Sequence, residues 1–172
     1  MNNVFWATIL YLVIVAALFI YGKNSEQKRH FDEMQLLYRL NSYKVAYYTT
    51  LSMLGFWMLM EIVDKASLPT ILTSTKILIT ITVGVLASDI YNIVHGSFFY
   101  IGEDSKKYLL LSLLLGIINL ISGISCLAKN PIVEGGYLIL GGGINNFILA
   151  CFFIPHAIAI AVKMHTFASE TN

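Results

Sequence analysis

Five polar side chains with the chemistry to hold a proton or a small ligand stand inside otherwise apolar stretches: Asp89, Asn92, His95, Asn119 and His156. A carboxyl group and an imidazole can exchange protons, and an amide can donate and accept hydrogen bonds. An acid on a lipid-facing helix surface costs roughly 2.5–3.5 kcal/mol, so we expect Asp89 to face the interior of a helix bundle. We interpret the five as a ligand or proton site. The alternative is an interhelical hydrogen-bond network that only determines how the helices pack.

The elements that position these residues are predicted to be membrane spans. Of the 172 residues, 57% are hydrophobic and only 12% are charged, which is unlike a soluble domain. About 20 residues of helix cross the hydrocarbon core, and five apolar runs approach or exceed that length. They lie near 4–21, 44–63, 70–101, 107–128 and 137–163. We predict an all-α, polytopic transmembrane helix bundle that forms one integral membrane domain over 1–172. A sixth span is the alternative, because glycines interrupt the start of the last run.

Depths estimated along these runs group the polar residues at two levels. At 1.5 Å per residue from the basic or aromatic span ends, Asp89 and Asn119 lie about 16–18 Å deep and His95 and His156 about 8–10 Å deep. We therefore expect Asp89 beside Asn119 near the midplane, with Asn92 on the same side of its helix. The two histidines at one level raise a further alternative, haem ligation, although no recognisable ligand spacing accompanies them. We predict no cofactor and no metal.

The distribution of positive charge predicts the orientation. Of the 11 Lys and Arg residues, eight fall on one side of the predicted spans and three on the other. The eight are Lys23, Lys28, Arg29, Arg39, Lys44, Lys106, Lys107 and Lys163. Because cytoplasmic loops carry the excess of basic residues, we predict the N-terminus outside and the C-terminus in the cytoplasm.

The longest predicted extramembrane segment, 22–43, has the pattern of an amphipathic helix. Phe31, Met34 and Leu37 recur at three-residue intervals, and charged residues, Arg39 among them, lie in other directions. Such a helix can lie on the headgroups as a structural elbow, or it can dock a partner protein. If it docks a partner, we expect Phe31, Met34, Leu37 and Arg39 to form the surface. The mixed charge argues against a nucleic-acid patch.

Three strings resemble a family of small polytopic membrane proteins of Gram-positive bacteria, many of them encoded beside helix-turn-helix regulators. The strings are DEMQ (32–35), SYKVAYY (42–48) and GSFFYIGEDSKKYLLLSLLLGIINLI (96–121). The resemblance covers about two thirds of the chain. It departs from the family at Met34, where Arg is common, and at SFFYIG, which replaces a lysine-containing variant. The resemblance implies a membrane fold and a bacterial origin, and it implies no reaction. We predict a multi-pass protein of the bacterial cytoplasmic membrane.

No phosphate-binding loop, zinc-protease helix or nucleophile motif occurs in the sequence. We therefore expect a non-enzymatic accessory protein of regulatory, sensory or immunity type. Its partners would be the lipid bilayer and another membrane or cytoplasmic protein, or a second copy of the chain. The alternative function is a small-solute or proton-coupled transporter, oligomeric, with Asp89, Asn92, Asn119 and His156 around the path.

Overall fold

The computed structural model describes residues 31–63, 70–71, 73–99, 101, 103–129, 133–134, 137–138 and 143–170. These residues form four helices: α2 (Glu33–Val63), α3 (Thr73–Val94), α4 (Ser105–Leu127) and α5 (Ile144–Glu170). Three strands of two residues each, β1 (Thr70–Ile71), β2 (Val133–Glu134) and β3 (Tyr137–Leu138), accompany them. The expectation of a helical fold is confirmed for this part of the chain. The predicted span 4–21 and residues 22–30 lie outside the described residues.

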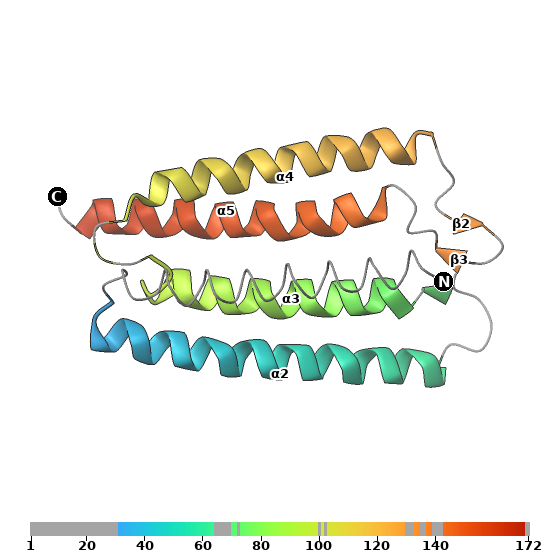
Figure 1. Ribbon diagram of the computed structural model, residues 1–172, viewed down its shortest axis with the longest axis horizontal. Helices are drawn as coiled ribbons and strands as arrows, with labels where there is room; N and C mark the ends of the chain where they lie inside the picture. Colours follow the sequence, from blue (N-terminus) through green and yellow to red (C-terminus); the bar gives the residue numbers. More distant parts are fainter. Residues whose placement is uncertain are drawn as a thin grey trace, which may run out of the picture.

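The four helices lie side by side in the order α2, α3, α5, α4, with α3 and α5 in the centre (Figure 1). The strands gather at one end, which we call the strand end; there β3 pairs in parallel with β1 and antiparallel with β2. We call the opposite end the basic end, because Arg39, Lys44, Lys106, Lys107 and Lys163 belong to it.

Three of the described helices are long and apolar enough to cross a membrane: α3, α4 and the part of α5 up to Thr166. Large apolar side chains are exposed on the bundle, as with Leu110 at 68% and Ile158 at 57%. Several of the most deeply buried side chains are instead polar, among them Ser42, Thr75 and Ser97. Lipid solvates apolar side chains, and polar ones are retained between helices, so this distribution is typical of a bundle surrounded by hydrocarbon.

Two of the predicted spans have wrong boundaries, whereas the run 107–128 corresponds closely to α4. The run 70–101 contains only 22 helical residues, because α3 ends at Val94. Gly96 follows with φ of 71°, a left-handed conformation that favours glycine. The N–H groups of Gly96 and Ser97 donate to the carbonyls of Ile93 and Asn92 at 3.1 and 2.8 Å, which forms a Schellman motif. The run 137–163 starts too early and stops too soon, since its first residues are in β3 and α5 continues to Glu170.

The predicted start of a separate helix near residue 44, after an interfacial helix at 22–43, is also wrong for the described residues. From Glu33 onward the chain is a single helix of 31 residues. Its start is a capping box: Asp32 Oδ1 accepts from the Gln35 N–H at 2.6 Å, and Gln35 Oε1 accepts from the Asp32 N–H at 3.2 Å. The DEMQ string is therefore a helix-start signal.

Candidate functional site

The most deeply placed ionisable side chain of the described residues is His156, on α5 between α3 and α4. It is only 6% exposed. Its Nδ1 atom lies 2.9 Å from Ser112 Oγ of α4, a hydrogen-bond distance. Its Nε2 atom lies 3.9 Å from Asp89 Oδ2 of α3, too far for a hydrogen bond. Nε2 is buried and has no hydrogen-bond partner among the described residues. We call Asp89 and His156 the internal pair.

Aromatic rings enclose His156. Phe98, in the turn after α3, contacts it edge-on with ring centroids 5.1 Å apart. Phe152, one helical turn earlier on α5, lies nearly parallel to it at 5.9 Å. Phe98 also contacts the ring of Tyr108 at 6.1 Å, which joins the turn to α4. Because the turn carrying Phe98 is at the basic end, this ring lies between His156 and that end of the bundle.

The internal pair lies between the basic end and the midplane. Lys163 Nζ donates to the Val94 carbonyl at 2.7 Å, which brings this part of α5 level with the end of α3. At 1.5 Å per residue, Asp89 is about 8 Å from Val94 and His156 about 10 Å from Lys163. The midplane depth expected for Asp89 is therefore wrong, because that estimate counted along a helix that ends sooner than predicted.

The pairing of Asp89 with Asn119 is wrong as well. Asn119 donates from Nδ2 to the carbonyl of Leu115 in its own helix, at 2.8 Å. Between α3 and α4 lies α5, which presents His156 to Asp89 (Figure 1). No property of a single apolar run indicates which other run will be its neighbour, so the sequence could not identify this partner. Ser112 and Phe98 were missed for the same reason.

His95 does not join His156. It lies beyond the end of α3 and is exposed; its Nδ1 is 2.8 Å from the Tyr91 carbonyl, and its ring stacks on Tyr91 at 4.1 Å. A second ring, Tyr38 of α2, lies 4.7 Å away. The histidines are therefore separated by about two helical turns in depth, and the structure does not place them at one level for haem ligation. The described residues contain no group of three or more His, Cys, Asp or Glu that could hold a metal ion.

Asn92 belongs to a hydrogen-bonded contact between α2 and α3. Its Nδ2 donates to Ser42 Oγ at 3.0 Å, and its Oδ1 accepts from Ser97 Oγ at 2.9 Å. Both serines are at most 1% exposed. Gln35 Nε2 adds bonds to the carbonyls of Gly96 at 2.8 Å and Phe99 at 3.3 Å. For Asn92 the geometry fits the packing network that the sequence left open as an alternative. In the sequence, the glycine at position 96 was the feature that could have indicated a helix end here.

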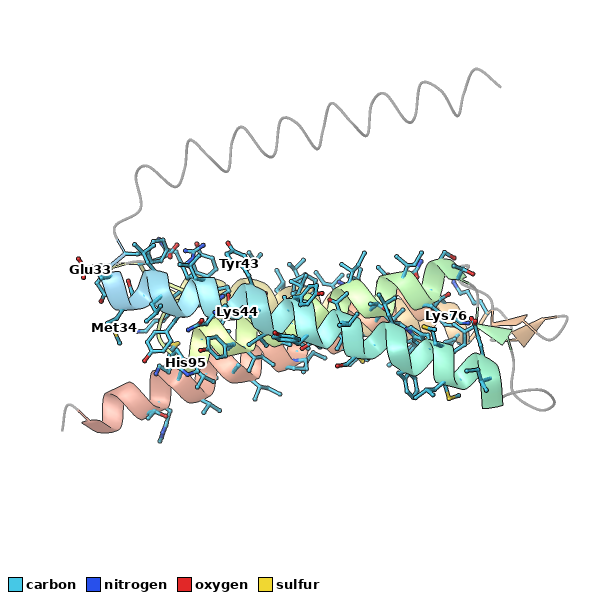
Figure 2. The ribbon with its side chains drawn as sticks, turned by 90° about the horizontal axis from the view of Figure 1, so that it is seen from below. Glu33, Met34, Tyr43, Lys44, Lys76 and His95 are labelled. Carbon is cyan, nitrogen blue, oxygen red and sulfur yellow. The ribbon has the colours of Figure 1, made fainter. Side chains whose placement is uncertain are left out.

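The four predicted docking residues divide into two groups. Met34 and Leu37 are 57% and 50% exposed, and they lie about 60° apart around α2. Arg39 points about 160° away from Leu37; its guanidinium lies over the ring of Phe31, 4.3 Å from the centroid. Figure 2 shows Glu33 and Met34 at the tip of α2, beyond Tyr43 and Lys44. Leu36, which the sequence analysis did not select, is exposed to 50% on this tip.

Comparison with protein-family models, with curated proteins and with solved structures found no significant match to this chain. The fold and the polar contacts therefore define a class only: a helical bundle with three helices able to cross a membrane, an acid–imidazole pair between two of its helices, and a helix end that exposes apolar side chains.

Proposed function

We propose that the chain is a multi-pass protein of the bacterial cytoplasmic membrane, with five spans, the N-terminus outside and the C-terminus in the cytoplasm. The spans are α3, α4, α5, residues 44–63 of α2, and residues 4–21. Among the described residues, Arg39, Lys44, Lys106, Lys107 and Lys163 belong to the basic end, whereas Lys76 and Lys129 are at the strand end. The basic end then faces the cytoplasm, in agreement with the positive-inside rule.

In this membrane the chain acts as a non-enzymatic accessory protein of regulatory, sensory or immunity type, through the first turns of α2. We call residues 33–43 the α2 extension. The observation that carries the proposal is that α2 runs unbroken for 31 residues, or about 46 Å, whereas the hydrocarbon core is about 30 Å thick. A span from Lys44 to Val63 fills that thickness. The α2 extension then continues about 16 Å past Lys44.

Water, rather than the headgroup layer, surrounds the tip of such an extension. The headgroup region adds roughly 5–8 Å on each side of the hydrocarbon core. Because Ser42 bonds to Asn92, two residues before the end of α3, Met34 lies about 9 Å beyond the level of Val94. A helix lying on the membrane surface would have to bend near residue 43, and α2 is one continuous helix there. The geometry therefore favours the docking surface over the structural elbow.

Hydrogen bonds hold the α2 extension against the rest of the bundle. Gln35 bonds to the turn after α3, and Ser42 bonds to Asn92. Met34 and Leu37 therefore present an apolar surface in water on a helix that is already ordered, which reduces the entropic cost of binding. The partner that fits is a cytoplasmic protein, or a cytoplasmic segment of a membrane protein, with an apolar helix or groove.

The position of the α2 extension can be measured with a nitroxide label on the full chain in nanodiscs. In a background with Cys126 and Cys151 replaced by Ser, Met34→Cys is labelled, with Leu110→Cys as the matched lipid-facing control. We expect the label at 34 to collide freely with a water-soluble nickel complex and the label at 110 to be protected from it. Equal protection at both positions would place Met34 in the membrane and refute the proposed geometry.

The docking itself is tested by capture of the full chain from native membranes, followed by mass spectrometry. The variant Met34→Ser, Leu37→Ser should lose the specific partner. The matched variant Leu110→Ser, Leu114→Ser, which changes two exposed leucines of α4, should retain it. A partner that binds both variants as well as the unmodified chain would argue against this surface.

The second function, proton-coupled transport of a small solute by an oligomer, is favoured by the internal pair alone. It predicts that Asp89→Asn abolishes a solute flux in proteoliposomes while the protein still folds. A flux that needs Asp89 but not Met34 and Leu37 would establish transport in place of docking.

A further inference from the structure

We propose that Asp89 and His156 together bind one exchangeable proton, which enters from the basic end past Phe98. This inference goes beyond the docking function, because it concerns the interior of the bundle rather than the α2 extension, and it deepens the second function by assigning the proton site. It also assigns roles to Ser112 and Phe98, two residues for which the sequence offered no signal.

The first argument is the total charge of the internal pair. With one proton, the pair is neutral overall, either as an acid beside an imidazole or as a carboxylate beside an imidazolium. Loss of that proton leaves a lone anion on Asp89, whose side chain is 24% exposed, and gain of a second leaves a lone cation on His156, whose side chain is 8% exposed. Both states are costly in a bundle surrounded by hydrocarbon. The two residues therefore titrate as one unit, and a single protonation state cannot be assigned to either residue alone.

The second argument is that His156 Nε2 has no hydrogen-bond partner among the described residues. In the contact around Asn92, both amide atoms have partners at 3.0 and 2.9 Å, as expected of a group that serves packing alone. His156 Nε2 has none, although its side chain is only 8% exposed. Ser112 binds Nδ1 and so keeps Nε2 directed at Asp89 Oδ2, 3.9 Å away. A proton added at Nε2 creates an N–H donor aimed at the carboxylate, and its release restores the nitrogen lone pair.

The acidic partner of His156 is identified by distance. Among the described residues, the carboxyl of Asp89 from α3 is the one Asp or Glu side chain within 4 Å of His156 Nε2. The neighbouring helix α4 contributes the uncharged Ser112. Tyr108 of α4 contacts Phe98 and donates its hydroxyl to Glu103, while Lys163 on α5 donates to the Val94 carbonyl. These groups lie toward the basic end, where a proton would enter.

Phe98 is the cover on this route. Its ring contacts both His156 and Tyr108, from a turn that follows α3 directly. Exchange of the proton with bulk water then requires the ring to move. Aromatic contacts of this kind contribute about 0.5–1.5 kcal/mol, so removing the ring should speed the exchange up to about tenfold.

The experiment is nuclear magnetic resonance on the full chain in nanodiscs, with ¹⁵N-labelled histidine and ¹³C-labelled aspartate, between pH 5 and 9. His156→Gln and His95→Gln assign the two histidine signals. We expect the ring nitrogens of His156 and the carboxyl carbon of Asp89 to shift in common steps. Asp89→Asn should displace the His156 transition by at least about one pH unit or remove it from the range. Asp89→Glu, which keeps the acid, should preserve a joint transition, and Phe98→Ala should accelerate exchange of the His156 N–H.

Each outcome of these measurements either supports or overturns the proposal. A His156 signal that is the same in the unmodified chain and in Asp89→Asn would show that the pair shares no proton and would overturn the proposal. If Asp89→Asn does not fold, Asp89→Glu and the unmodified chain still decide, since independent transitions of the two residues would be equally negative. An unchanged exchange rate in Phe98→Ala would refute the route past this ring. None of these readouts depends on a protein partner, so failure here leaves the docking proposal intact.

Discussion

Gly116→Ala tests the closest approach of α4 and α5, the two helices that carry Ser112 and His156. A Cβ atom at position 116 would lie 2.8 Å from Ile154 Cγ1 and 3.4 Å from the Ile154 nitrogen. The optimal separation of two carbons is about 3.5–4.0 Å, so the helices or the isoleucine must shift. Overpacking of this kind costs about 1–3 kcal/mol. The intrinsic preference of alanine over glycine in a helix opposes it by up to about 1 kcal/mol.

Gly55→Ala on α2 is the matched control, because a Cβ atom there would have no neighbour within 4 Å. The helix preference is common to both substitutions, so the difference between them isolates the packing cost. We expect Gly116→Ala to be less stable than Gly55→Ala by about 1–3 kcal/mol. The assay is reversible unfolding in mixed detergent micelles, followed by tryptophan fluorescence. A difference below about 0.5 kcal/mol would refute the close contact at Gly116, and with it the register that brings Ser112 to His156.

The polar contact between α2 and α3 makes two further predictions. Asn92→Leu removes the side-chain bonds to Ser42 and Ser97, while these serines keep bonds to the carbonyls of Arg39 and of residue 92. At about 0.5–1.5 kcal/mol for each lost bond, it should destabilise the protein by about 1–3 kcal/mol in the same assay. Asn119→Leu, which removes only a bond to its own helix, should change stability by less than about 0.6 kcal/mol; equal effects would contradict the assigned network. Gly96→Ala imposes φ of 71° on a residue with a side chain and should cost about 1 kcal/mol, whereas the control Gly55→Ala should cost nothing.

Helix ends could be predicted from the sequence where they depend only on where an apolar run begins and ends. The run 107–128 corresponds to α4 because its apolar residues begin after Lys107 and end before Lys129. The ends of α2 and α3 were missed because contacts between helices determine them. Asn41 and Ser42 resemble a helix start in sequence, yet Ser42 donates to the Arg39 carbonyl within α2 and accepts from Asn92 of α3. A polar residue that supplies an interhelical contact has the same local pattern as one that caps a helix.

The sequence predicted that Asp89 belongs to a buried site, but it did not predict which residues lie beside it. An acid within an apolar run has to be buried between helices, and the structure does place Asp89 against another ionisable group. The identity of that group depends on the spatial order of the helices, which is α2, α3, α5, α4. The hydropathy of the individual runs is compatible with several orders, so it could not identify the partner of Asp89. His95 was assigned to the same level as His156 because the helix was assumed to continue past Val94. The Schellman turn at Gly96 removes it from the bundle interior.

The turn at 96–99 connects the two regions for which we propose functions. Gln35 of the α2 extension donates to the carbonyls of Gly96 and Phe99. Between these two residues in sequence is Phe98, whose ring covers His156. A displacement of the α2 extension therefore acts on the backbone on both sides of the ring that separates the internal pair from the basic end. Any coupling through this turn has to be reciprocal, because a partner that changes proton affinity is itself bound more or less tightly as the proton is exchanged.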